Sequence, residues 1–180
     1  MIEIDKVLNS ISDEFTELPN ELVQGLTNNS SKVKKGFIFF AFQGDNCDGN
    51  DFIEDAFKNG ACLVVSDSDK IESQKNIIKV DDVRVAAGIA CSNFYDFPQN
   101  KLKLIGITGT NGKTSTSSIL KSILDADNKK TLQIGTSGIK PPLDIVSNLT
   151  TPDIFDLYEI LNYAVNEHYK YVILEVSSHA

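Results

Sequence analysis

The sequence predicts an α/β protein in which a small α/β domain precedes an incomplete, P-loop-type domain built on an open parallel sheet. Apolar, strand-like runs alternate with helix-like periodic stretches along the chain, which is typical of βαβ units. A glycine-rich turn, "GTNGKT" (109–114), joins one such run to a helical pattern. Pro98 interrupts the alternation, so we expect domains at residues 1–98 and 99–180.

The elements of the first domain follow from its apolar periodicity. The aromatic run 36–42 predicts a buried strand, and the runs 61–65 and 76–80 predict two more. Residues 51–60 predict a helix that ends at Gly60. Asp81 or Asp82 is placed to cap a further helix that buries Val83, Ala87, Ala90 and Phe94.

The second domain begins with a predicted strand at 101–108 and, after the glycine turn, a helix with an apolar face formed by Ile119, Leu120, Ile123 and Leu124. A strand at 130–135 follows. Thr151 is placed to cap a helix with Pro152 in its first position. The run 170–176 reads as a strand buried on both faces, as in a parallel sheet. The chain ends soon after this strand, so we expect the second sheet to be incomplete.

Composition narrows the possible functions. The net charge of −8 at pH 7 disfavours a broad nucleic-acid or membrane surface, which would need a basic excess. The three cysteines, Cys47, Cys62 and Cys91, lack metal-type spacing and are interpreted as reduced thiols. The chain shows no secretory leader and no apolar run of membrane-spanning length. We therefore expect a cytoplasmic protein.

The glycine turn is a candidate phosphate-binding loop. A strand, a glycine turn and a helix direct backbone N–H groups and the positive end of the helix dipole at one point. Lys113 would contact the β- and γ-phosphates of a nucleotide, and the Thr114 hydroxyl would bind Mg²⁺. The spacing departs from Walker A, because Ile107 stands where the first glycine should be. The alternative is a structural turn with a surface lysine.

Two further stretches predict functional residues. Glu175 is the one charge in an otherwise apolar strand, so we expect it at the strand's carboxyl end, near the loop, as a magnesium ligand. The alternative is an exposed strand-end glutamate. Thr150 is free to contact an anion if Thr151 is a helix cap. Ser177, Ser178 and His179 follow Glu175 on the same rim.

The segments "GITGTNGKTS", "LTTPD" and "EVSSHA", in this order, resemble the central domain of the Mur ligase family, and most closely its MurE type. Residues 25–61 resemble that family's uridine-nucleotide domain. The resemblance implies an ATP-dependent ligase of peptidoglycan synthesis. Such an enzyme adds a diamino acid to UDP-N-acetylmuramoyl-L-alanyl-D-glutamate through an acyl phosphate, with ATP and Mg²⁺ as cofactors.

The resemblance also implies roles for individual residues. Lys113 and Glu175 would be catalytic, and Thr114 and Glu175 would hold the metal. The ATP loop would comprise Gly109, Thr110, Asn111, Gly112, Lys113, Thr114 and Ser115. Substrate contacts would fall on Asn28, Ser30, Asp45, Asn46, Cys47, Thr150, Thr151 and Ser177. The chain departs from the family pattern at Asn29, Ser31 and Leu149.

The chain is much shorter than this family's members, so we expect a monomeric ligase fragment without ligase activity of its own. A non-catalytic nucleotide-binding module and a ligase like folylpolyglutamate synthetase remain alternatives. A GTPase is disfavoured because no Asn-Lys-x-Asp sequence follows the loop. The part that would distinguish diaminopimelate from lysine as the added residue is not represented in these residues.

Overall fold

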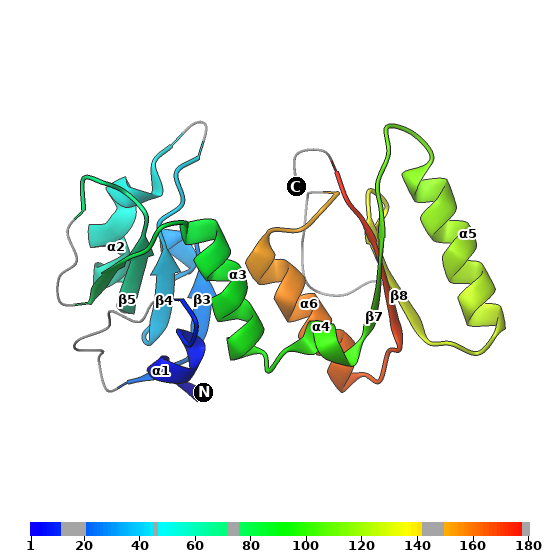
Figure 1. The fold of residues 1–180 in the computed structure, drawn as a ribbon, viewed down its shortest axis with the longest axis horizontal. Helices are drawn as coiled ribbons and strands as arrows, with labels where there is room; N and C mark the ends of the chain where they lie inside the picture. Colours follow the sequence, from blue (N-terminus) through cyan, green and yellow to red (C-terminus); the bar gives the residue numbers. More distant parts are fainter. Residues whose placement is uncertain (12–20, 45–46, 72–75, 142–149, 178–180) are drawn as a thin grey trace. The chain divides into compact units, whose positions relative to one another are not determined.

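The computed structural model describes residues 1–11, 21–44, 47–71, 76–141 and 150–177. They form two compact units, Met1–Phe94 and Tyr95–Ala180, each with its own mainly parallel sheet (Figure 1). The units divide before Pro98, which begins the short helix α4 (Pro98–Lys101) of the second unit. None of the described helices has both the length and the apolar character that crossing a membrane would require.

The sheet of the first unit has four parallel strands in the order β3-β4-β5-β6. The strands are β3 (Gly25–Thr27), β4 (Phe37–Phe40), β5 (Ala61–Ser66) and β6 (Ile77–Lys79). The last three confirm the strands expected from the apolar runs. A small antiparallel ribbon of β1 (Ile2–Glu3) and β2 (Leu22–Val23), with helix α1 (Ile4–Val7), was not expected from the sequence.

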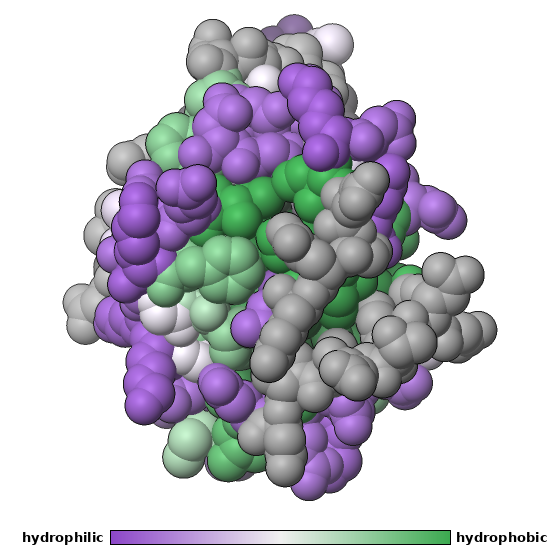
Figure 2. Space-filling view, turned by 90° about the vertical axis from the view of Figure 1, so that its left-hand side faces the viewer, coloured by the Kyte–Doolittle hydropathy of each residue, from purple (hydrophilic) through white to green (hydrophobic). Residues whose placement is uncertain are grey.

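Two helices cover this sheet, α2 (Ile53–Lys58) and α3 (Val83–Phe94), and Figure 1 shows them on opposite sides of it. The 3₁₀ turns η1 (Ser30–Lys32) and η2 (Gly49–Phe52) complete the unit. Asp82 caps α3, since its Oδ1 accepts from the backbone N–H groups of Arg84 (2.8 Å) and Val85 (3.0 Å). Figure 2 looks onto this unit and shows apolar surface surrounded by hydrophilic side chains.

The sheet of the second unit has the order β7-β10-β8-β9. Its strands are β7 (Lys103–Ile107), β8 (Thr131–Gly135), β9 (Gly138–Lys140) and β10 (Tyr171–Glu175). The central strand β10 pairs in parallel with both β7 and β8, as predicted for the run 170–176, which was expected to form a strand buried on both faces. The antiparallel hairpin strand β9 was not anticipated.

Helices α5 (Lys113–Ala126) and α6 (Ile154–Asn166) lie on opposite faces of this sheet (Figure 1). The chain passes from β7 through α5 to β8, and then returns through α6 to β10, which lies between the two. Because such crossovers are right-handed, reversing their direction puts the helices on opposite faces. Ligands of open α/β sheets bind where the strand order reverses, beyond the carboxyl ends of the strands.

The two faces of the sheet differ in chemistry. The α6 face is an apolar core formed by Leu102, Leu132, Ile134, Ile160, Leu161, Ala164, Tyr169 and Val172. Side chains alternate along a strand, so the neighbouring positions Gln133, Gly135, Ile173 and Glu175 belong to the opposite face, where α5 packs. Polar groups are therefore buried between α5 and the sheet.

Two helical predictions were wrong in detail. In α5, Ile119 and Ile123 are 62% and 60% exposed, while Leu120 and Leu124 are half-buried, so the apolar face turns only partly inward. In α6 the cap is Asp153 and not Thr151, because Asp153 Oδ1 accepts from Phe155 N–H (3.0 Å) and Asp156 N–H (2.9 Å). Helix α6 begins at Ile154, so Pro152 precedes it.

The environments of the three free thiols give a testable difference in reactivity. Burial, and then the charge of Glu21, raises the pKa of the Cys62 thiol from 9.0 to about 11, and Cys91 is also buried. Because thiolates are the reactive species, we expect a disulfide reagent at pH 8 to label the exposed Cys47 rapidly and the buried pair only on unfolding. Colorimetric thiol titration measures this. Rapid labelling that persists in Cys47→Ser would contradict it.

Candidate functional site

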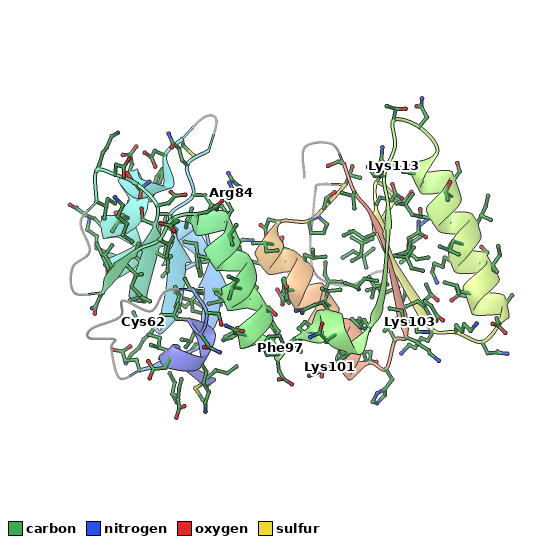
Figure 3. All side chains as sticks on the ribbon, viewed as in Figure 1. Cys62, Arg84, Phe97, Lys101, Lys103 and Lys113 are labelled. Carbon is green, nitrogen blue, oxygen red and sulfur yellow. The ribbon has the colours of Figure 1, made fainter. Side chains whose placement is uncertain are left out.

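The loop between β7 and α5 has the backbone expected of a phosphate-binding turn. Gly109 and Gly112 have φ of +144° and +82°, in the region that side chains disfavour. Gly112 directly precedes α5, whose first residue is Lys113 (Figure 3). The predicted strand–turn–helix context of the loop is thus present. Thr110, Asn111 and Ser115 are exposed on it.

Positive charge is concentrated at this point. The ammonium group of Lys113 donates to the carbonyl of Gly109 over 2.6 Å, so the lysine side chain folds back across the loop. An ammonium group has three N–H donors, and the others can bond a ligand. The first-turn N–H groups of α5 have no acceptor within the helix and carry the positive end of its dipole. The arrangement suits an anion such as a phosphate.

Glu175 is fully buried at the carboxyl end of β10, next to this loop. Its Oε2 accepts from the hydroxyl of Thr114 at 2.9 Å and from the hydroxyl and N–H of Thr136 at 3.2 and 3.4 Å. Its Oε1 accepts from the Ser117 hydroxyl at 2.9 Å. The sequence-based alternative of an exposed strand-end glutamate is therefore wrong.

These hydrogen bonds decide the charge of the carboxyl group. Burial is the largest single influence and raises the pKa of Glu175. The bonds donated by Thr114, Ser117 and Thr136 act in the opposite direction and outweigh it, so the pKa lies below its usual value. Glu175 is therefore a carboxylate at neutral pH, available to a cation.

Gly135, at the end of β8, provides the space that this carboxylate occupies. A Cβ atom at this position would lie 2.6 Å from Cγ of Glu175 and would overlap its carboxyl group. Any side chain here would therefore displace Glu175. Glycine is required here because of this close approach and not because of the backbone conformation, since Gly135 belongs to the regular strand β8 and follows the buried Ile134.

The threonine pair lies on the same rim. Thr151 donates its hydroxyl to the Glu175 carbonyl over 3.0 Å and accepts from Ser177 N–H at 3.1 Å, which ties residues 150–153 to the end of β10. The hydroxyls of Thr150 and Thr136 are 3.4 Å apart. The structure thus brings together the predicted residues of the second unit: Lys113, Thr114, Thr150, Thr151, Glu175 and Ser177. Ser178 and His179 lie outside the described residues.

The predicted residues of the first unit follow two adjacent strands. Asn28 and Ser30 come after β3, and Cys47 belongs to the loop after β4. Asn59 donates its amide to the Ser30 carbonyl over 2.9 Å, which anchors this turn. Parallel strands end at one edge, so these residues share the carboxyl edge of the first sheet. Asp45 and Asn46 lie outside the described residues.

Sequence reasoning missed several residues at both edges. Ser117, Gln133, Gly135 and Thr136 surround Glu175, and the signal for them was the polar Gln133 inside an otherwise apolar strand. In the first unit, Arg84 donates to the Gln43 carbonyl over 3.1 Å and its guanidinium lies 4.8 Å from the centre of the Phe42 ring. Arg84 therefore braces the loop after β4.

The residues present fit a magnesium ion. The oxygens of Thr114 and Glu175 are 2.9 Å apart, and neighbouring ligands of an octahedral Mg²⁺ are separated by about the same distance. The Thr114 hydroxyl donates its hydrogen bond to Glu175, so the lone pairs of the Thr114 oxygen are available to a metal. No group of three or more His, Cys, Asp or Glu side chains suited to a metal occurs in the described residues. One carboxylate with hydroxyl, phosphate and water oxygens is the mode that Mg²⁺ commonly uses.

Comparison with known families gives two matches, one for each of the two compact units. Residues 22–95 match the model described as "Mur ligase family, catalytic domain", and residues 107–180 match the "Mur ligase middle domain". The second match begins at the last residue of β7 and includes the loop, the threonine pair and Glu175.

Two curated relatives carry the name UDP-N-acetylmuramoyl-L-alanyl-D-glutamate–2,6-diaminopimelate ligase. That of Caldanaerobacter subterraneus subsp. tengcongensis is 42% identical over 176 residues, covering 97% of this chain and 36% of the relative. That of Fusobacterium nucleatum subsp. nucleatum is 40% identical over 158 residues, covering 87% of this chain and 32% of the relative. The chain thus spans about a third of the length of these relatives.

Solved structures show the same fold. A structure of a ligase with that name superimposes with a TM-score of 0.77 at 26% identity, covering 99% of this chain and 36% of the other. A MurF ligase from Thermotoga maritima, solved with ADP, has a TM-score of 0.55 at 22% identity, covering 87% of this chain and 32% of the other. With both units matched by models of one family and by relatives over nearly its whole length, the chain belongs to the Mur ligase family.

Proposed function

We propose that the chain supplies the nucleotide-binding and precursor-binding parts of an ATP-dependent ligase of peptidoglycan synthesis. The ligase would add a diamino acid to UDP-N-acetylmuramoyl-L-alanyl-D-glutamate. The observation that carries the proposal is the buried Glu175 carboxylate bonded to Thr114 at the first turn of α5, beside the Lys113 loop. The names of the relatives support the choice of substrate.

The proposed reaction explains why these groups are needed. A carboxylate is a poor acyl donor, so its oxygen first attacks the γ-phosphorus of ATP, which forms an acyl phosphate and releases ADP. An amine then attacks the acyl carbon, inorganic phosphate leaves, and the amine loses a proton as the amide forms. The first step brings two anions together. Lys113 and the N–H groups of α5 would hold the phosphates and stabilise the charge that develops.

ATP and Mg²⁺ are the proposed cofactors. Thr114 and Glu175 would hold the metal, which when bound neutralises phosphate charge. Thr150, Thr151 and Ser177 present hydroxyls beside Glu175 and would orient the carboxylate of the precursor. The loop from Gly109 to Ser115 would hold the nucleotide.

The first unit is proposed to bind the uridine nucleotide of the precursor through Asn28, Ser30, Asp45, Asn46 and Cys47. The shared sheet edge of the described members supports this. The other proposed partners are small molecules, the muramoyl dipeptide and a diamino acid. We also propose that the protein is a monomer and that it is located in the cytoplasm. Because the chain spans about a third of its relatives, the tests below measure binding by the chain itself.

Lys113→Ala should weaken binding of Mg-ATP by about ten- to a hundredfold, because a charge-assisted hydrogen bond contributes roughly 1.5–3 kcal/mol. Isothermal titration calorimetry measures the two dissociation constants. Lys103→Ala is the matched control. Lys103 is the first residue of β7, and the loop follows the opposite end of that strand (Figure 3). Equal affinity of wild type and Lys113→Ala would refute the phosphate-loop assignment.

Gly135→Ala and Glu175→Gln should have similar effects if Glu175 binds the metal. The first displaces the carboxylate and the second removes its charge. Both should reduce the gain in ATP affinity that Mg²⁺ provides, by about tenfold, while affinity measured in EDTA changes little. Calorimetry with and without Mg²⁺ checks this. An undiminished gain in both variants would show that Glu175 is not a metal ligand.

Addition of UDP to the ¹⁵N-labelled chain should shift the amide resonances of Asn28, Ser30 and Cys47, and those of Asp45 and Asn46. Inorganic diphosphate, as a control, should shift fewer of them because it lacks the nucleoside. NMR titration of the full chain follows all of these signals at once. A folded chain whose shifts occur elsewhere would contradict the assignment to this edge.

A further inference from the structure

A hydrogen-bonded series of buried polar side chains lies beneath Glu175, between α5 and the sheet. It consists of Gln133 from β8, Ser117 from α5 and the carboxylate itself, with exposed fractions of 2%, 0% and 0%. Gln133 Nε2 donates to the Ser117 hydroxyl oxygen over 2.8 Å, and the Ser117 hydroxyl lies 2.9 Å from Glu175 Oε1. The three groups come from three different elements.

Burying a glutamine at this position has a cost that needs an explanation. Its neighbours in β8, Leu132 and Ile134, are buried and apolar, and its partner in register on β10 is Ile173, also buried. An apolar side chain would satisfy the packing of this strand without any requirement for hydrogen bonds. A buried amide destabilises the fold unless it is bonded. The amide is bonded here to Ser117, and at 3.3 Å to the hydroxyl of Ser118.

The hydrogen bond from Gln133 determines the direction of the next one. Because the Ser117 oxygen accepts from the amide, its own proton must be donated elsewhere. The acceptors within reach are Glu175 Oε1 and the Thr114 carbonyl, each at 2.9 Å. The carboxylate carries the charge, and charge-assisted bonds are the stronger ones. The hydrogen bonds are therefore donated in one direction, from Gln133 to Ser117 and from Ser117 to Glu175.

These hydrogen bonds hold Oε1 on the buried side of the carboxylate and direct Oε2 toward the sheet edge, where Thr114 and Thr136 donate to it. Oε1 is tied to Ser117, which is buried, whereas Oε2 lies among Thr114 and Thr136, at the edge of the sheet beside the loop. The carboxylate plane is thereby fixed, with Oε2 next to the Thr114 hydroxyl. Groups that orient a metal-binding carboxylate in this way commonly matter to the metal site.

We propose that Gln133 and Ser117 are positioning residues that hold the Glu175 carboxylate in the orientation needed to bind Mg²⁺ with the nucleotide. The inference rests on the proposed function of Glu175 as the magnesium carboxylate. It extends the site to two buried residues that touch neither ATP nor the metal.

The test compares the ATP affinity of the 180-residue chain in Mg²⁺ and in EDTA. Gln133→Met keeps the length of the side chain and removes the donor, Ser117→Ala removes the hydroxyl, and Ser117→Thr keeps it. The first two should lower the gain due to Mg²⁺ by about tenfold with unchanged affinity in EDTA, and Ser117→Thr should retain the gain. Ser122→Ala is the matched control, because its hydroxyl bonds a carbonyl of its own helix.

The outcomes separate the role of these two residues from the proposed function itself. A full Mg²⁺ gain in Gln133→Met and Ser117→Ala would overturn the positioning role and leave Glu175 as the metal ligand. Equal losses with and without Mg²⁺ would show a general packing role and would overturn it too. A wild-type chain without any gain from Mg²⁺ would refute the proposed function and the inference with it. If Ser117→Ala does not fold, as circular dichroism would show, Gln133→Met decides the question.

Discussion

The burial of one carboxylate, that of Glu175, is the constraint on which the second unit depends. A charge excluded from water must be compensated by hydrogen bonds, and Glu175 receives them from α5 and from the residue after β8. These bonds couple the first turn of α5 to the centre of the sheet. The helix that begins at the candidate phosphate-binding turn is therefore positioned by the same group that is proposed to bind the metal.

The two faces of this sheet serve different purposes. Apolar packing against α6 stabilises one face, with Leu132, Ile134 and Val172 in its core. On the other face, α5 buries Ser117 and leaves Ile119 and Ile123 largely exposed. Polar contacts thus hold α5, the helix that follows the loop, and such contacts depend on direction. Helix α6 on the opposite face is held by apolar packing, which is not directional.

Both units place their candidate residues at the carboxyl edge of a parallel sheet. The physical reason is common to the two, because strands that run in one direction bring the loops that follow them to one edge. In the first unit these are the segments after β3 and β4, and Arg84 braces the second of them. In the second unit they are the loop after β7, the end of β8 and the end of β10. Residues far apart in sequence meet at each edge for this reason.

The amino-acid sequence alone predicts the α/β class, most strands and helices, and the strand–turn–helix context of the loop with Lys113, because these depend on local periodicity and on glycine conformations. It also singled out Glu175, since a lone charge in an apolar run needs a special environment. The partners of that charge follow only from the three-dimensional arrangement of the elements. Thr151 bonds the end of β10 instead of capping α6, and Gly135, Ser117 and Gln133 gather around Glu175. These contacts join residues distant in sequence, and no local pattern encodes which strand pairs with which. That pairing placed β10 between β7 and β8, and it thereby formed the site.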